Sequence, residues 1–120
     1  MSKTILVVDD SASVRQVVSI ALKGAGYGVL EASDGQDALE KLNGDKVNLI
    51  ISDVNMPRMD GITFVKEVKK LSAYKFTPII MLTTEGAEEK KKEGQMAGAK
   101  AWVVKPFKPD QMLKAVSMLI

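Results

Sequence analysis

Acidic side chains follow two of the apolar runs in this chain, and a lysine follows a third. The run ILVV leads into Asp9 and Asp10, the run LIIS leads into Asp53, and the run WVV leads into Lys105. Each of these residues alone has an ordinary explanation as a helix cap, a turn residue or an edge lysine. Together they indicate a functional site, because buried strands that end in bare acids are unfavourable for stability.

Three neighbouring carboxylates would repel one another, and protonating two of them at neutral pH would need large rises in pKa. A divalent cation removes this conflict, and Mg²⁺ prefers hard oxygen ligands while keeping several waters. We expect Asp10 and Asp53 to bind Mg²⁺ directly and Asp9 to act through a water. The turn after Asp53 offers the backbone carbonyl of Asn55 as a further ligand.

A cation with open coordination positions can recruit a phosphoryl group, and two further side chains suit the other phosphoryl oxygens. These are the amine of Lys105 and the hydroxyl of Thr83, which follows the apolar run IIML. Asp53 is then the nucleophile, and its attack on phosphorus gives an aspartyl phosphate. The charge added by phosphorylation would draw Lys105 and Thr83 inward.

The composition excludes several other chemistries. The 120 residues include no cysteine and no histidine, so the chain cannot form a disulfide, a thiolate metal site, a Ser-His-Asp triad or a phosphohistidine of its own. The net charge is only +2, and the densest charge run, residues 88–93, mixes glutamate with lysine. We therefore expect no nucleic-acid partner.

Length and hydropathy favour a single domain over residues 1–120, with no output domain. The apolar fraction is 46%, but no window approaches the roughly 18 apolar residues that a membrane span needs. The apolar stretch after Lys3 is too short for a signal peptide. We expect a cytoplasmic monomer without a membrane partner.

Five short apolar runs alternate with longer amphipathic segments. The predicted strands are residues 4–8, 28–32, 48–53, 78–83 and 101–104. The segments between and after them have apolar residues at helical spacing, with Gly26 after the first helix, Asp34 before the second and Pro109 in the first turn of the last. A weaker pattern predicts the fourth helix over residues 87–97.

Strands separated by single helices must run parallel, because antiparallel neighbours would need only hairpins. The first, third and fourth runs are apolar on both alternations and are therefore central, whereas the second alternates and is an edge. The strand order 2-1-3-4-5 satisfies this, which gives a flavodoxin-like (βα)5 doubly wound α/β fold. Its strand ends place Asp9, Asp10, Asp53, Thr83 and Lys105 in one site.

The fragments that carry these residues occur in a characteristic order. They are Val-Asp-Asp at 8–10, Ser-Asp-Val-Asn-Met-Pro at 52–57 with Met-Asp-Gly at 59–61, Leu-Thr-Thr-Glu at 82–85 and Lys-Pro-Phe at 105–107. In this combination the chain resembles, over nearly its whole length, the receiver domain of two-component response regulators of the single-domain chemotaxis (CheY-like) type. The resemblance implies a switch that acts on no substrate besides its own phosphoryl group.

The resemblance also assigns residue roles. It implies that Asp53 accepts a phosphoryl group from a CheA-like histidine kinase in an Mg²⁺-dependent reaction. It implies magnesium ligation by Asp9, Asp10 and the Asn55 carbonyl, and phosphoryl contacts from Thr83 and Lys105.

A conformational switch follows from the same resemblance. The threonine moves toward the phosphoryl group, and an aromatic residue of the fifth strand, here Trp102, turns into the vacated space and changes the face made by helix 4, strand 5 and helix 5. Regulators that bind the flagellar motor commonly carry tyrosine there, so Trp102 is a departure. Thr84 and Glu85 are further switch or tuning residues, and polar groups at Asn55 and Glu85 favour rapid autodephosphorylation.

Several outputs stay open at this point. The downstream partner could be a flagellar switch component or another chemosensory protein, a separate phosphatase could act on the signal, and the chain could serve as a phosphate sink. An aspartate-nucleophile phosphohydrolase is less favoured, because it would carry an acid where Asn55 stands. A flavodoxin-like electron carrier is also less favoured, because Asp9 and Asp10 would repel a flavin phosphate.

Overall fold

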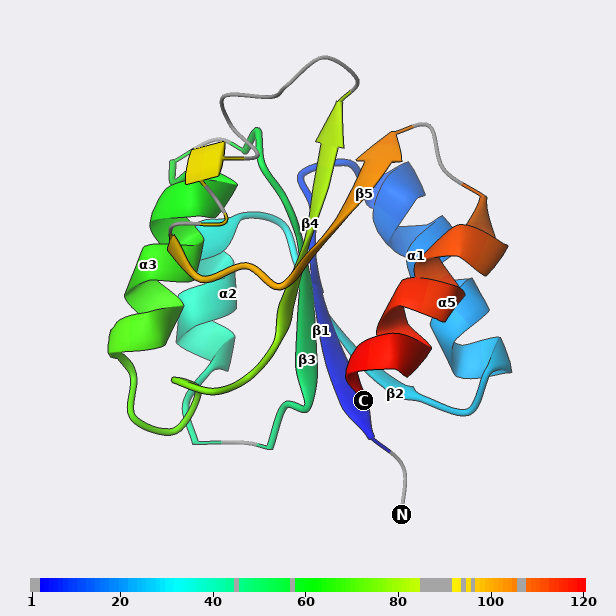
Figure 1. Ribbon diagram of the computed structural model, residues 1–120, viewed down its shortest axis with the longest axis horizontal. Helices are drawn as coiled ribbons and strands as arrows, with labels where there is room; N and C mark the ends of the chain where they lie inside the picture. Colours follow the sequence, from blue (N-terminus) through cyan, green and yellow to red (C-terminus); the bar gives the residue numbers. More distant parts are fainter. Residues whose placement is uncertain are drawn as a thin grey trace.

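The computed structural model describes residues 3–44, 46–56, 58–84, 92–93, 95, 97–105 and 108–120. Its core is a five-stranded parallel sheet with the order β2-β1-β3-β4-β5, as the sequence predicts (Figure 1). Each predicted strand boundary lies within one residue of the observed one. The strands are β1 (Thr4–Val8), β2 (Gly28–Ala32), β3 (Leu49–Asp53), β4 (Ile79–Thr84) and β5 (Ala101–Lys105).

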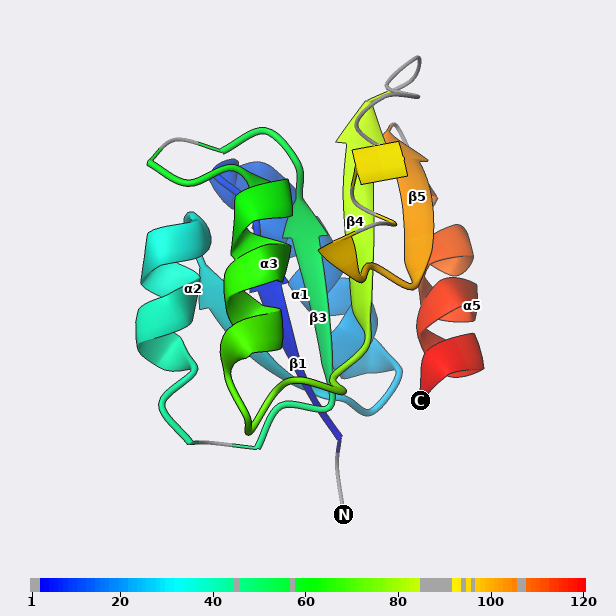
Figure 2. The same ribbon diagram turned by 60° about the vertical axis from the view of Figure 1, so that its left-hand side comes forward.

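Helices cover both faces of this sheet. Figures 1 and 2 show α2 and α3 on one face and α1 and α5 on the other. The helices are α1 (Ala12–Gly24), α2 (Gly35–Lys41), α3 (Gly61–Lys70) and α5 (Pro109–Leu119). The helix predicted over residues 87–97 lies mostly outside the described residues and stays a prediction. In the described part of the chain, no helix combines the length and the hydropathy that crossing a membrane requires.

The alternation of side chains along β1 divides the core into two clusters. Leu6 and Val8 pack into the cluster beneath α2 and α3, whereas Ile5 and Val7 pack into the cluster beneath α1 and α5. All four side chains are fully buried. Because a strand buried on both faces reads as a continuous apolar run, this packing explains why the sequence pattern placed β1 in the centre.

Three of the helices begin at polar caps on the carboxyl side of the sheet. Ser11, Asp34 and Asp60 accept backbone N–H bonds at the starts of α1, α2 and α3 respectively. Each cap satisfies a donor that the first helical turn leaves unpaired. The caps therefore fix the points at which the chain turns back from the strand ends, which is where the predicted site lies.

Candidate functional site

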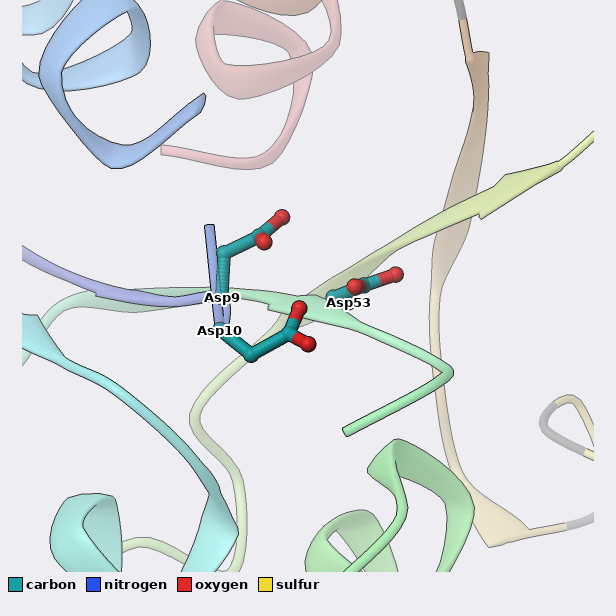
Figure 3. A group of neighbouring side chains, drawn as sticks. All are labelled: Asp9, Asp10 and Asp53. Atoms are coloured by element: carbon teal, nitrogen blue, oxygen red, sulfur yellow. The ribbon is translucent and has the colours of Figure 1, made fainter. Parts of the chain in front are cut away.

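Asp9, Asp10 and Asp53 form an acidic cluster at the ends of β1 and β3 (Figure 3). One carboxylate oxygen from each residue lies within 4.8 Å of the other two. Asp9 is fully buried and Asp53 is 6% exposed, whereas Asp10 is exposed. The structure thus brings together the three acids that the sequence singled out, and Asp10 keeps one side of the cluster open to solvent.

Both the side chain and the backbone of Asp9 are held in place. Its Oδ1 accepts the backbone N–H of Ser11 at 2.9 Å, and its own N–H donates to the carbonyl of Ala32 at 3.1 Å. The guanidinium of Arg15 donates to the Asp9 carbonyl at 2.5 Å. These bonds fix the position of Asp9 and of its fully buried carboxylate.

Lys105 links the two buried acids of the cluster. Its Nζ lies 3.0 Å from Oδ2 of Asp9 and 3.3 Å from Oδ2 of Asp53. The lysine side chain is 22% exposed, so these contacts are only partly screened by water. One ammonium against three carboxylates leaves the site with two unbalanced formal negative charges, which favours the arrival of another cation.

The pKa values of the paired residues reflect this excess of negative charge. Burial and the neighbouring charge of Asp9 raise the pKa of Asp53, and the contact with Lys105 offsets this only in part. Burial works to lower the pKa of Lys105, but its hydrogen bond to Asp9 and its attraction to Asp53 and Asp9 raise it overall. Lys105 therefore stays charged, and ionised Asp53 gains from any further positive charge nearby.

The residues of the acidic cluster fit a magnesium ion. All donors are hard carboxylate oxygens, and their mutual spacing allows one ion to contact several of them. The exposed position of Asp10 provides a path from solvent. Asn55 lies in the exposed turn after β3, one residue beyond Val54, and its backbone carbonyl stays the predicted further ligand.

A close backbone approach anchors the start of α3 behind Asp53. The N–H of Gly61 donates to the carbonyl of Val54 at 2.7 Å. A Cβ atom built on Gly61 would lie 2.1 Å from the carbonyl oxygen of Asp53, so no side chain fits there. The first residue of α3 therefore packs directly on the backbone of the predicted nucleophile.

Thr83 and Trp102 occupy neighbouring strands beside the cluster. Thr83 is 4% exposed near the end of β4, and it follows Leu82, which pairs with Asp53 across the sheet. Trp102 of β5 pairs with Met81 and packs, half-buried, against the core beneath α2 and α3. Its indole Nε1 is buried without a hydrogen-bond partner among the described residues. Trp102 therefore contributes to core packing, and its role in a switch stays a prediction.

The remaining sequence candidates are less fully described. Thr84 is the last residue of β4. Glu85 lies outside the described residues, so nothing in the structure bears on its predicted tuning role.

Two arginines near the site were missed by the sequence analysis. Arg15 holds the backbone of Asp9, and Arg58 forms a bidentate ion pair with Asp34, with contacts of 2.8 Å and 2.9 Å. Asp34 was expected only as a helix cap, a role that it also has. The residues around Arg58 predict a turn, but the sequence holds no signal that names the acid that this arginine contacts.

Comparison with known proteins adds evidence that is independent of this geometry. Residues 5–117 match the sequence model of the response regulator receiver domain. The chain is 44% identical over 112 residues to the chemotaxis protein CheY1 of Helicobacter pylori, covering 92% of this chain and 90% of that protein. It is 37% identical over 112 residues to the protein PilG of Pseudomonas aeruginosa, covering 93% and 83%. The structure of the Vibrio cholerae chemotaxis protein CheY4 is similar with a TM-score of 0.95, at 52% identity and 100% coverage of both chains.

Proposed function

We propose, since this chain belongs to the receiver-domain family of response regulators and is similar to its CheY-type members, that phosphorylation of Asp53 switches its interaction with partner proteins. One observation carries the proposal. The carboxylate of Asp53 lies 3.3 Å from the amine of Lys105 and within 4.8 Å of two further carboxylates. A nucleophile, a counter-charge and a cation site thus meet at one point.

Asp53 acts as the nucleophile toward a phosphohistidine of a CheA-like histidine kinase. Its Oδ atom attacks phosphorus, the new O–P bond forms as the N–P bond of the donor breaks, and the histidine nitrogen leaves with the bonding electron pair. Hydrolysis of the acyl phosphate by water restores the carboxylate and ends the signal. The protein thereby carries out its own phosphorylation and dephosphorylation and acts on no other substrate.

Magnesium fits the acidic cluster, with Asp9, Asp10, Asp53 and the Asn55 carbonyl as the residues that would hold it. When bound, the ion supplies positive charge against the carboxylates and the phosphoryl oxygens. Burial and the charge of Asp9 raise the pKa of Asp53, and Lys105 offsets this only in part, which favours a bound cation beside this carboxylate.

Lys105 and Thr83 respond to the phosphoryl group. Phosphorylation adds about one negative charge at Asp53, and Lys105 already contacts that carboxylate, so its ammonium is placed to bind a phosphoryl oxygen. Thr83 is buried near the end of β4, and it pairs with Val104 of β5. A shift of Thr83 would therefore reach β5, where Trp102 lies, and change the surface offered to a downstream chemosensory or flagellar protein.

Labelling by a small acyl phosphate tests the proposal directly. Asp53→Asn should abolish the mass increase of one phosphoryl group that the wild-type protein shows in acetyl phosphate and Mg²⁺. Asp110→Asn makes the same chemical change at an exposed acid in the first turn of α5 and should leave labelling intact. Equal labelling of the Asp53 variant and the wild type would contradict the assignment.

A further inference from the structure

The loop that joins β3 to α3 contains an unusual ion pair. Arg58 lies in this loop, residues 54–60, and its guanidinium donates to both carboxylate oxygens of Asp34 at the start of α2. The Asp34 side chain is 7% exposed and also accepts the backbone N–H of Asp37 at 2.8 Å. The arginine side chain is 59% exposed. An exposed residue of the loop thus forms an ion pair with a buried acid at the start of α2, and both carboxylate oxygens of that acid accept hydrogen bonds.

The backbone of Arg58 shows that this contact constrains the loop. Its φ is 64°, and it is the one non-glycine residue with positive φ in the described part of the chain. A residue with a Cβ adopts this conformation only when its surroundings compensate for the strain. The bidentate contact with Asp34 is such a compensation, because two parallel hydrogen bonds fix both the position and the orientation of the guanidinium.

Asn55 lies three residues before Arg58 in the same loop. The end of the loop next to β3 is fixed, because Val54 donates its N–H to Leu82 at 3.1 Å and accepts the N–H of Gly61 at 2.7 Å. These bonds hold the two ends of the loop together. The ion pair of Arg58 with Asp34 fixes its middle, and Asn55 lies between the two fixed points.

We infer that Arg58 and Asp34 are positioning residues for the cation site, since their ion pair restrains the backbone of the loop that carries the Asn55 carbonyl. The inference rests on the proposed function. It assigns a task to a residue pair that contacts neither the phosphoryl group nor the cation. Groups that orient a ligand from behind commonly change metal affinity by tenfold or more.

Electrostatics alone predicts a different outcome, which makes the inference testable. If only charge mattered, removing the Arg58 cation would strengthen Mg²⁺ binding, and removing the Asp34 anion would weaken it. If the pair positions the loop, Arg58→Ala and Asp34→Asn should both weaken Mg²⁺ binding, by about tenfold. The double variant should be no weaker than either single variant, because both changes remove the same contact.

The experiment measures thermal unfolding across a series of Mg²⁺ concentrations, so that the rise in Tm gives the affinity and the Mg²⁺-free value gives the stability. Asn at position 34 can still accept the N–H of Asp37, which preserves the helix cap. Lys70→Ala is the matched control, because it removes an exposed lysine that contacts Glu67 at 3.4 Å away from the loop. It should leave Mg²⁺ affinity at the wild-type value.

Arg58→Gly separates the ion pair from the backbone conformation. Glycine accepts positive φ without strain, so this variant should lose less stability than Arg58→Ala but show the same loss of Mg²⁺ affinity. Wild-type affinity in Arg58→Gly would overturn the role of the ion pair. So would opposite changes in affinity for Arg58→Ala and Asp34→Asn, or lower stability in both variants without any change in affinity.

Asp10→Asn distinguishes a failure of this inference from a failure of the proposed function. The wild-type protein should show a Mg²⁺-dependent rise in Tm that Asp10→Asn loses. No rise in the wild-type protein would overturn both the magnesium site and its positioning. A rise that Asp10→Asn loses and Arg58→Ala keeps unchanged would overturn the positioning alone.

Discussion

Asp34 and Asp53 are both buried acids at the same edge of the sheet, but their surroundings shift their pKa values in opposite directions. Both side chains expose little surface to solvent, with exposed fractions of 5% and 6%, but desolvation is the largest influence only on the pKa of Asp53. The hydrogen bonds from Arg58 and from the backbone of Asp37 lower the pKa of Asp34. Burial and the charge of Asp9 raise the pKa of Asp53, although Lys105 is close to it. Burial alone therefore does not decide how an acid behaves here.

Burial is the largest cause of the raised pKa of Asp53, and the number of acids that share each cation adds to the difference. Arg58 gives two hydrogen bonds to Asp34 alone, whereas the amine of Lys105 is divided between Asp9 and Asp53. Asp34 also accepts a backbone N–H from the first turn of α2, where the helix dipole favours a negative charge. Asp34 is thus compensated and serves the fold. The negative charge of Asp53 is only partly compensated, and a bound cation would supply the missing positive charge, as the proposed reaction requires.

The largest expected effect comes from removing the shared cation. Lys105→Ala should destabilise the Mg²⁺-free protein by about 2 kcal/mol, because two buried carboxylates lose their counter-charge. Mg²⁺ should restore much of this loss, since it supplies charge at the same place. Urea unfolding with and without Mg²⁺ measures both effects. Unchanged stability in Lys105→Ala without Mg²⁺ would mean that the lysine does not compensate the cluster.

A smaller effect, of opposite sign at the two acids, is expected for Asp→Asn changes. Asp53→Asn should raise the free energy of unfolding in Mg²⁺-free buffer at pH 7 by about 1 kcal/mol, because it removes a buried charge that repels Asp9. Asp34→Asn should lower it, because that carboxylate is favourably bonded. The same urea series at neutral pH measures both variants. A change of the same sign in the two variants would remove the distinction between these acids.

The smallest expected effect is in the pH dependence of stability. The pKa of Asp34 lies below its ordinary value of 3.8, so its stabilising contribution is present above pH 3.8 and is lost as the pH falls through the lowered value. The pKa of Asp53 in the folded protein lies above its ordinary value of 3.8, so the folded state takes up this proton before the unfolded state does. Stability therefore increases as the pH falls through the raised value, and the increase is complete below pH 3.8.

Unfolding midpoints in Mg²⁺-free buffer between about pH 7 and pH 3 test this pH dependence, since this range spans the ordinary carboxylate pKa values. The Asp53→Asn variant should lack the gain in stability on mild acidification, and the Asp34→Asn variant should lack part of the loss at the acid end. Lys70→Ala, which alters an exposed ion pair, serves as the control with an unchanged profile. Identical profiles for all three variants and the wild type would contradict the opposite pKa shifts.

The sequence predicted the strands, their order and the meeting of Asp9, Asp10, Asp53 and Lys105, because parallel strands place their carboxyl ends at one edge of a sheet. Periodicity and strand ends are local features that a sequence displays. The contact between Arg58 and Asp34 joins residues 24 positions apart through the reach of a long side chain, and no local pattern encodes it. The partial charge compensation of Asp53 likewise became visible only when its distances to Lys105 and Asp9 were known.

Gly61 limits where this site can vary. Because Gly61 lies against the backbone carbonyl of Asp53 with no room for a Cβ atom, substitution at residue 61 cannot introduce a new group beside Asp53 without displacing the chain. The exposed side chain of Asn55 carries no such restriction. Natural or engineered substitutions near Asp53 can therefore be accommodated on the solvent side of the loop, whereas the inner side has no room for them.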